Sequence, residues 1–380
     1  MSCIYWQRCG GCSYSLDNED EYKKVKTNKF KQLLQNLSQE NVPFGETVFI
    51  PENTRRRASF VFKYSKGKLE FGFNEKSSRD IISIEQCALL TPRINKNIGF
   101  IKNLINEICK TPIVGKLKKG KPENNSIASG DILVCDAENG LDIVVETIAP
   151  FSLEHKLIIS EFIQNNSDVI RISHRKDIND EAEPIVEKVK PYIRISDIDV
   201  FISAGTFLQA SKEGEKALID LVVKYVGSDE GNIADLFCGI GTFSYPLSKN
   251  KNNKITSMDS SKPLLDGFKT SINKNMITNI RIMQKNLFKY PLDEEELKSF
   301  HAIVFDPPRA GAAAQMKKIK ETGADKQPGK IIAVSCNPHS FIKDANILLS
   351  ANYMIKEITL VDQFTYSNHC ELVAQFVKKS

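Results

Sequence analysis

The sequence lacks any apolar run long enough to cross a membrane. No stretch of its 380 residues approaches the ~18 consecutive apolar residues of a spanning helix, which argues against a membrane protein. The first residues also lack an apolar segment behind a basic start, so we expect no secretory signal and a cytoplasmic protein. Internal repeats and long low-complexity segments are missing too, and a hydrophobic share of 41% is ordinary for a folded chain.

A strong net charge of either sign is also lacking. Lysine and arginine together number 52 against 47 acidic residues, which is compatible with a nucleic-acid partner but only weakly favours one. Arginine is scarce outside one run, Arg55-Arg56-Arg57, directly before a strand-like segment. Guanidinium groups suit bidentate phosphate contacts, so the run is a candidate nucleic-acid contact. A solvated start of a strand explains it about as well.

Nine cysteines are present, and their odd number argues against a disulfide framework in a long, cytoplasmic chain. Cys3, Cys9 and Cys12 are crowded at the N-terminus, and Cys87 stands far beyond them. Four thiolates in this pattern suit an iron–sulfur cluster or zinc. The five-residue spacing between Cys3 and Cys9 fits zinc less well than the usual short pairs.

Up to about residue 204, helical and strand-like patterns mix irregularly. Helical spacing is predicted over 17–37, 92–109 and 153–165, and strands over 60–64, 69–73, 131–135, 141–146 and 169–173. We therefore predict three consecutive regions: a metal-cluster segment over 1–15, an α+β domain over 16–204, and a third domain over 205–380.

From residue 205 onward, short apolar strands alternate with helices. Such alternation predicts an α/β domain with a parallel, doubly wound sheet. The last two strands, 356–361 and 371–377, are joined by only nine residues, too few for a crossover helix, so this pair should be antiparallel. A parallel sheet that ends in an antiparallel pair is the outline of a Rossmann-like class I methyltransferase.

A glycine turn marks the first strand of this domain, in the segment Asp235-Leu-Phe-Cys-Gly239-Ile-Gly241-Thr242-Phe243. Glycines at a strand-to-helix turn let a ligand approach the backbone and the free N–H groups. Asp259, eighteen residues past Gly241, can accept hydrogen bonds from ribose hydroxyls. The third glycine expected for a pyrophosphate is missing, which favours S-adenosylmethionine over NAD.

Three further residues lie at predicted strand ends, where the crevice of such a sheet is expected. Asp306 precedes two prolines, Cys336 stands in Ser-Cys-Asn-Pro before a helix, and Glu371 begins the last strand. An aspartate rather than Asn before the two prolines argues against a nitrogen acceptor. A helix N-terminus can favour the Cys336 thiolate, which suits a nucleophile, and Glu371 could be a general base. Taken singly, a packed cysteine and a surface glutamate are the commoner explanations.

Cysteine, carboxylate and methyl donor are the minimum set for methylating carbon 5 of uracil. That carbon is a poor nucleophile until a thiolate adds to carbon 6. It then attacks the methyl group, and a base must remove its proton before the thiol leaves.

With these motifs the chain resembles the RNA uracil-5-methyltransferase family over nearly its whole length. The resemblance rests on the cysteine pattern, on Phe207-Leu-Gln209, on the glycine turn, on Asp306-Pro-Pro-Arg-Ala-Gly, on Ser-Cys336-Asn-Pro and on His369-Cys-Glu371. It implies that Cys336 is the nucleophile and Glu371 the base. It also implies a pocket for S-adenosylmethionine and contacts to RNA. The implied cofactor residues are Gln209, Phe237, Gly239, Gly241, Thr242, Asp259, Asn286 and Asp306. The expected RNA contacts are Arg55, Arg56, Arg57, Phe207 and Arg309.

Some positions depart from the common family pattern. Asp259 replaces the more usual Glu and keeps the charge, and Ser211 stands where Asn is common. Phe364-Thr365 replaces the usual Phe-Pro, which is expected to loosen the loop before Glu371. None of these changes removes a catalytic group.

The resemblance also bears on the metal and the RNA. In the ribosomal-RNA branch, four cysteines of the N-terminal pattern hold a 4Fe–4S cluster, so we expect one on Cys3, Cys9, Cys12 and Cys87, and 23S rRNA as substrate. The N-terminal OB-fold (TRAM) domain of many relatives is expected to be absent, because the chain starts at the first cysteine. A monomer is expected. The alternatives are the same reaction on tRNA, an inactive iron–sulfur RNA-binding relative, and a methyltransferase for small molecules or proteins.

Overall fold

The computed structural model describes residues 3–15, 18–113 and 127–379 of the chain. These residues form two compact units, each built from separate pieces of sequence. The first unit comprises residues 1–17, 51–193 and 202–211, and the second comprises 18–50, 194–201 and 212–380. No helix in the described ranges is both long and apolar enough to cross a membrane.

The second unit is built on an eight-stranded sheet with the order β1-β16-β17-β15-β14-β11-β12-β13. Strands β11 to β15 pair in parallel, whereas β17 runs antiparallel to both β15 and β16. The predicted parallel sheet with a C-terminal antiparallel pair is therefore confirmed. Its strands are β1 (Val48–Phe49), β11 (Asn232–Leu236), β12 (Lys254–Asp259), β13 (Ile280–Gln284), β14 (Ala302–Phe305), β15 (Lys330–Ser335), β16 (Tyr353–Asp362) and β17 (Glu371–Lys378).

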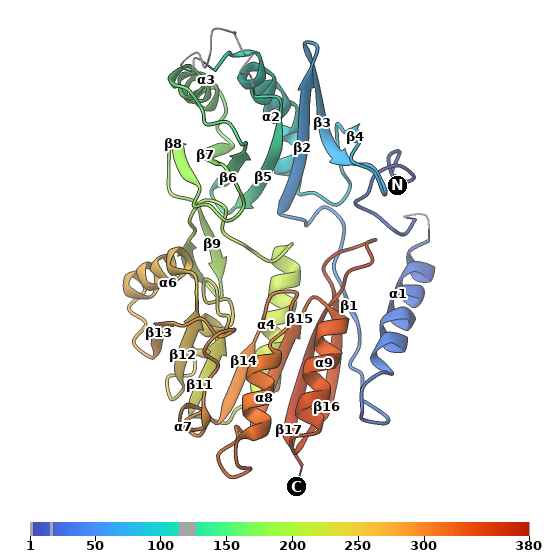
Figure 1. Ribbon diagram of the computed structural model, residues 1–380, viewed down its shortest axis with the longest axis vertical. Helices are drawn as coiled ribbons and strands as arrows, with labels where there is room; N and C mark the ends of the chain where they lie inside the picture. The colour runs from blue at the N-terminus through green and yellow to red at the C-terminus, as the bar shows by residue number, and fades with distance from the viewer. Residues whose placement is uncertain (1–2, 16–17, 114–126, 380) are drawn as a thin grey trace, which may run out of the picture. The chain divides into compact units, whose positions relative to one another are not determined.

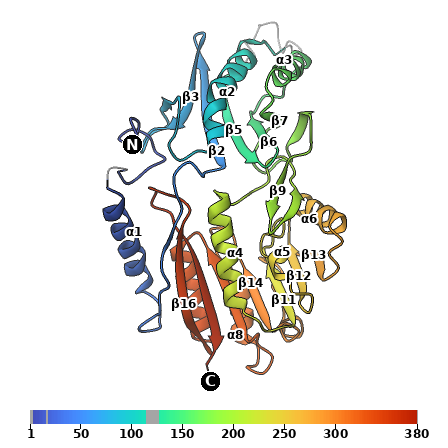
Figure 2. The ribbon, with the colours of Figure 1, turned by 180° about the vertical axis from the view of Figure 1, so that it is seen from behind.

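Helices cover both faces of this sheet, as expected for strands that are buried on both sides. Figure 1 shows α8 and α9 in front of the sheet, and Figure 2, from behind, shows α4 on the opposite face. The helices of the unit are α1 (Glu19–Leu34), α4 (Lys212–Val226), α5 (Ser244–Leu247), α6 (Lys262–Lys274), α7 (Glu294–Leu297), α8 (Ala313–Glu321) and α9 (Pro338–Leu349).

Helix α1 belongs to this second unit although it lies near the start of the chain. It contacts α9, and Figure 1 shows it on the side of the unit where α9 lies. The side chains of Phe30 and Leu34 enter the core around β14 to β17. The strand that follows, β1, pairs in parallel with the end of β16, where Phe49 faces Asp362.

The first unit has a seven-stranded sheet with the order β4-β3-β2-β5-β6-β7-β8. All neighbours are antiparallel except β6 and β7, which α3 connects. Helices α2 and α3 contact each other and bury apolar side chains in one core with the sheet. Its elements are β2 (Arg57–Ser65), β3 (Lys68–Asn74), β4 (Ile81–Ser83), α2 (Pro92–Lys110), β5 (Ser129–Ala137), β6 (Gly140–Glu146), α3 (Leu153–Gln164), β7 (Val169–Arg175) and β8 (Glu183–Glu187). A separate small sheet contains β9 (Tyr192–Ile195) and β10 (Ile198–Phe201).

Candidate active site

Strand register brings Cys336 and Glu371 together. In the antiparallel pair of β15 and β17, Ser335 is the partner of Leu372. The next residue on β15 and the preceding residue on β17 are therefore neighbours across the pair, and these are Cys336 and Glu371. Asp306 follows directly after β14, the strand on the other side of β15.

The charges of these side chains influence one another's pKa values. Burial, followed by the charge of Asp306, raises the pKa of Glu371 to about 8. A hydrogen bond from Gln363 and the positive charge of Arg309 oppose this rise. Nε2 of Gln363 donates to Oε1 of Glu371 over 3.2 Å. The carboxyl group therefore lies in a dry environment with one amide donor and one cation near it.

The Cys336 thiol is held in its neutral form in this structure. Burial, followed by the charges of Glu371 and Asp306, raises the pKa of Cys336 to about 11, while Arg309 acts in the opposite direction. The sequence led us to expect a thiolate favoured by the N-terminus of α9. Burial and the two carboxyl groups act against such a thiolate, and the role of Cys336 as nucleophile stays a prediction.

The glycine turn after β11 has an unusual backbone. Phe237, Gly239 and Gly241 all have positive φ angles, of 60°, 54° and 93°. A Cβ atom on Gly241 would lie 2.4 Å from the Phe268 ring, so this glycine is required by packing against α6. A Cβ atom on Gly239 would meet no described atom within 4 Å. Gly239 therefore borders open space, as a ligand cradle requires.

Two aspartates lie at this turn. Asp259 accepts hydrogen bonds from the backbone N–H of Gly239 over 3.0 Å and of Ser261 over 2.9 Å. These bonds fix its carboxylate at the end of β12. Asp235 is fully buried and accepts a hydrogen bond from Ser244, and burial raises its pKa to about 7. Its second oxygen has no hydrogen-bond partner among the described residues.

The remaining predicted cofactor residues of the second unit lie in two loops. Half-buried Thr242 follows Gly241 in the glycine turn. Asn286 follows β13, where its side-chain oxygen accepts a hydrogen bond from the backbone N–H of Lys289 over 3.1 Å. Two residues on, the half-exposed ring of Phe288 packs against the ring of Phe237 with centroids 5.2 Å apart. We did not predict a role for Phe288 from the sequence. Its aromatic ring, two residues after the candidate Asn286, is the signal that could have indicated it.

Phe207 and Gln209 belong to the first unit, in the segment 202–211. The arginine run holds this segment: Nε of Arg56 donates to the Gln209 carbonyl over 3.1 Å, and Arg57 donates to the Leu208 carbonyl over 2.6 Å. Arg56 is only 1% exposed, so it is not accessible to a phosphate in this structure. Arg57 also faces the ring of exposed Phe207, 4.6 Å from its centroid.

Arg55 and Arg309 remain as the other predicted RNA contacts. Nε of Arg55 donates to the Arg57 carbonyl over 3.2 Å, and the backbone of Arg55 bridges to Ser211. Arg309 is exposed in the loop after Asp306, where the Asn337 side chain donates to its carbonyl over 3.0 Å. Of the five predicted contacts, Phe207 and Arg309 are the most exposed.

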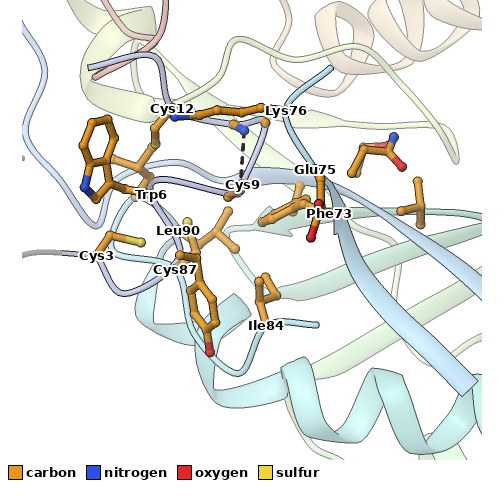
Figure 3. A pocket seen from close by; sticks show the side chains of 18 of the residues that line it. Cys3, Trp6, Cys9, Cys12, Phe73, Glu75, Lys76, Ile84, Cys87 and Leu90 are labelled. Atoms are coloured by element: carbon orange, nitrogen blue, oxygen red, sulfur yellow. Dashed lines mark hydrogen bonds between the residues drawn. The ribbon is translucent and has the colours of Figure 1, made fainter. Parts of the chain in front are cut away.

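The four cysteines predicted to bind the metal cluster line one pocket of the first unit, with a volume of about 790 Å³. Figure 3 shows Cys3, Cys9, Cys12 and Cys87 around this pocket. Burial, followed by the neighbouring thiols of Cys87, Cys9 and Cys3, raises the pKa of Cys12 to about 12. Within residues 3–15, 18–113 and 127–379, however, no three acidic, His or Cys side chains stand in a metal-ligating arrangement. The thiols thus share a pocket without forming a finished metal site.

Comparison with protein families gives one extended match. A family model described as "tRNA (Uracil-5-)-methyltransferase" matches residues 18–379. A protein of Agrobacterium fabrum named as an uncharacterized RNA methyltransferase is 31% identical over 371 residues, which cover 97% of this chain and 82% of that protein. A "23S rRNA (uracil(1939)-C(5))-methyltransferase RlmD" of Aliivibrio salmonicida is 23% identical over 380 residues, covering 98% and 81% of the two chains.

Among solved structures, the chain resembles a crystal structure of a Pyrococcus abyssi tRNA (uracil-54, C5)-methyltransferase in complex with S-adenosyl-L-homocysteine. The TM-score is 0.68 at 22% identity, and the match covers 95% of this chain and 84% of that one. At this identity the likeness shows a common fold. The predicted class I methyltransferase fold is therefore confirmed.

Proposed function

The chain belongs to the RNA uracil-5-methyltransferase family and uses S-adenosylmethionine, and from this premise we propose that it methylates a uridine of 23S rRNA through a covalent bond to Cys336. The observation that carries the mechanism is the adjacency of Cys336 and Glu371 at the paired ends of β15 and β17. A nucleophile and a base at one edge of the sheet are what carbon-5 methylation of uracil requires.

Cys336 is the nucleophile in this proposal. Its thiol first loses a proton, and the sulfur then bonds to carbon 6 of the uracil while the electrons of the 5,6 double bond move toward carbon 5 and oxygen 4. Because the pKa of Cys336 is about 11 owing to burial and nearby carboxyl groups, only a small thiolate fraction exists at neutral pH before substrate binds. The target base must leave its stack to reach a crevice at a sheet edge.

Glu371 is the base that completes the reaction. After carbon 5 has accepted the methyl group, the carboxylate removes the proton from carbon 5. The electrons of that C–H bond restore the 5,6 double bond, and the sulfur of Cys336 leaves carbon 6. Burial gives this carboxyl group a pKa of about 8, which is close to the ideal for a base that operates near neutral pH.

S-adenosylmethionine, when bound, supplies the methyl group that carbon 5 accepts. The residues at the glycine turn fit such a ligand, because Gly239 borders open space and one oxygen of buried Asp235 lacks a partner in the described part of the chain. The residues proposed to hold it are Gln209, Phe237, Gly239, Gly241, Thr242, Asp259, Asn286 and Asp306. The carboxylate of Asp259, fixed by two backbone N–H groups, would accept hydrogen bonds from the ribose.

We also propose that Cys3, Cys9, Cys12 and Cys87 hold a 4Fe–4S cluster. Four thiols that line one pocket support this proposal, although closing the sulfurs around a metal requires local movement from the present arrangement. The cluster would supply a structural cross-link between the N-terminal segment and the residues before α2. An absorption spectrum of anaerobically purified protein tests it: a broad band near the violet is expected, and a colourless protein with bound zinc would contradict it.

The choice of 23S rRNA over tRNA rests on the cysteine pattern and on the name of the Aliivibrio relative. The family description and the Pyrococcus structure instead name tRNA, which makes tRNA the second candidate. We propose a monomer that contacts RNA through exposed Phe207 and Arg309, together with Arg55 and Arg57. Mapping 5-methyluridine in both RNAs from a strain lacking the protein decides between the two substrates.

A covalent trap tests the mechanism directly. A 23S rRNA transcript containing 5-fluorouridine should form a denaturation-resistant adduct with the protein, because Glu371 cannot remove fluorine from carbon 5. The Cys336→Ala variant should form no adduct and no product. The Cys109→Ala variant is a matched control, since Cys109 is a buried cysteine packed in the core of the first unit. If neither the 23S transcript nor a tRNA transcript yields an adduct with the unaltered protein, the covalent mechanism is wrong.

A further inference from the structure

The loop between β16 and β17 holds a side chain that reaches the proposed base. Gln363 is 3% exposed and donates from Nε2 to Oε1 of Glu371 over 3.2 Å. A hydrogen bond to a buried carboxylate favours the charged form and restricts the side chain to one orientation. The hydrogen bond to Glu371 is the contact through which Gln363 would act on the reaction.

The same loop is tied to helix α1 by a buried polar cluster. Asp362, beside Gln363, is 1% exposed and accepts hydrogen bonds from the ammonium group of Lys26 and the hydroxyl of Tyr22. Lys26 also donates to the Phe364 carbonyl over 3.1 Å, and the backbone N–H of Tyr366 donates to the Tyr22 hydroxyl over 2.9 Å. Removing one partner of a buried pair leaves an uncompensated charge, so these contacts strongly favour a single loop conformation.

Two additional contacts extend the tether. The Thr365 hydroxyl donates to the Ile50 carbonyl over 2.9 Å, at the end of the segment that contains β1. Lys29, one turn after Lys26, donates to the Asn368 side chain over 2.9 Å. The sequence led us to expect a loosened loop where Thr365 replaces proline, but the threonine instead contributes a bond.

From these contacts we propose that Gln363 is a positioning residue for Glu371, and that helix α1 holds Gln363 in place through Tyr22, Lys26 and Asp362. This inference rests on the proposed role of Glu371 as the base. Two of these residues, Tyr22 and Lys26, lie more than three hundred positions earlier in the sequence than the loop they hold.

The expected pH–rate profile depends on all the groups that face Glu371. Asp306, after β14, raises the pKa of Glu371 by its charge, whereas Arg309 and Gln363 lower it, and Cys336 and Cys370 are neighbouring thiols. The Gln363 side chain carries no formal charge at any pH. Replacing it by methionine removes the donor without changing any formal charge.

The test compares Gln363→Met with the protein itself on a 23S rRNA transcript, or on a tRNA transcript if that is the substrate. Loss of the donor should move the rising limb of the pH–rate profile about one unit to higher pH, and slow turnover about tenfold at neutral pH. Because the carbon-5 proton leaves late, the methylated RNA–protein adduct should accumulate on a denaturing gel. Gln375→Met is the matched control: Gln375 is also buried, on β17, but donates to the Tyr225 carbonyl over 2.6 Å.

Tyr22→Phe tests the tether from α1. It keeps the ring that packs on Tyr366 with centroids 4.7 Å apart and removes only the hydroxyl. We expect a shift of the limb in the same direction as for Gln363→Met, and a smaller one. An exposed change on the same helix, Lys24→Met, should leave the profile unchanged.

The outcomes separate this inference from the proposed function. If Glu371→Gln accumulates the adduct but Gln363→Met shows neither a shifted limb nor an adduct, Gln363 does not position the base. A Tyr22→Phe variant that loses thermal stability without any shift of the limb would remove α1 from the inference. If Glu371→Gln turns over normally, Glu371 is not the base, and the inference about Gln363 loses its premise while the covalent role of Cys336 is still tested by the 5-fluorouridine adduct.

Discussion

The two glycines of the cofactor turn allow a paired test of fold against ligand binding. Both have positive φ angles, 54° at Gly239 and 93° at Gly241, which disfavour any side chain. They differ in their surroundings, because a Cβ atom on Gly241 would lie 2.4 Å from the Phe268 ring while one on Gly239 would meet no described atom within 4 Å. Alanine at Gly241 should therefore damage the fold, and alanine at Gly239 should damage cofactor binding.

The expected magnitudes follow from these two environments. A non-glycine residue with positive φ costs roughly 1–2 kcal/mol, which applies to both variants. Overpacking against a buried ring adds roughly 1–3 kcal/mol at Gly241 alone, since Phe268 is 0% exposed and has little freedom to move. Gly241→Ala should thus lose roughly 2–5 kcal/mol of unfolding free energy, and Gly239→Ala roughly 1–2 kcal/mol.

Calorimetry measures both effects on the same samples. Thermal unfolding should show Gly241→Ala melting several degrees below Gly239→Ala, because ~1 kcal/mol shifts Tm by about 2–4 °C in a domain of this size. Titration with S-adenosylmethionine should show at least a roughly tenfold weaker Kd for Gly239→Ala, whose methyl group would occupy ligand space. Equal melting temperatures for the two variants would refute the packing argument, and unchanged affinity for Gly239→Ala would refute the cradle.

Three further predictions concern charge and anchoring. Asp306→Asn removes a negative neighbour of Glu371, so the rising limb of the pH–rate profile at saturating cofactor should move to lower pH; a shift to higher pH would contradict this assignment. Burial raises the pKa of Asp344 from 3.8 to about 6, so its contribution to stability is full below pH 3.8 and is lost as pH rises through 6. Asp344→Asn should accordingly raise Tm at pH 8, where the gain in unfolding free energy is at most ~3 kcal/mol, and should leave Tm unchanged at pH 3. If Gln209 holds the cofactor as proposed, Arg56→Lys should raise KM for S-adenosylmethionine roughly several-fold with little change in kcat, because it loosens the segment that carries Gln209.

Local patterns were sufficient to predict most of the sheet in the second unit. Each parallel strand is a short apolar run followed by a helix, so its position and direction follow from the sequence. The short link from Asp362 to Cys370 also fixed the antiparallel pair, and with it the adjacency of Cys336 and Glu371. Strand β1 could not be predicted, because a two-residue strand has no periodicity and depends wholly on its pairing with β16.

Residues whose partners are distant in sequence were harder to interpret. Helical spacing was predicted over 17–37, but within α1 the apolar Val25 is 46% exposed whereas Lys26 is buried. A lysine takes that inward position because Asp362, far along the chain, supplies its counter-charge. Likewise, the arginine run was interpreted as a phosphate contact, whereas Arg56 is buried against the carbonyl of Gln209. No local pattern distinguishes an arginine that binds backbone carbonyls from one that binds phosphate.

The pKa of Glu371 results from a balance that the sequence cannot show. Burial and Asp306 raise it, while Gln363 and Arg309 lower it, and the outcome is about 8. A carboxyl group with an ordinary pKa would be a weak base for a carbon-bound proton, and one that was buried without donors would have a still higher pKa and a smaller charged fraction at neutral pH. The site therefore needs both burial and donors. Each substitution among these neighbours should move the pH profile in the direction set by its charge or hydrogen bond: lower for loss of Asp306, and higher for loss of Arg309 or Gln363.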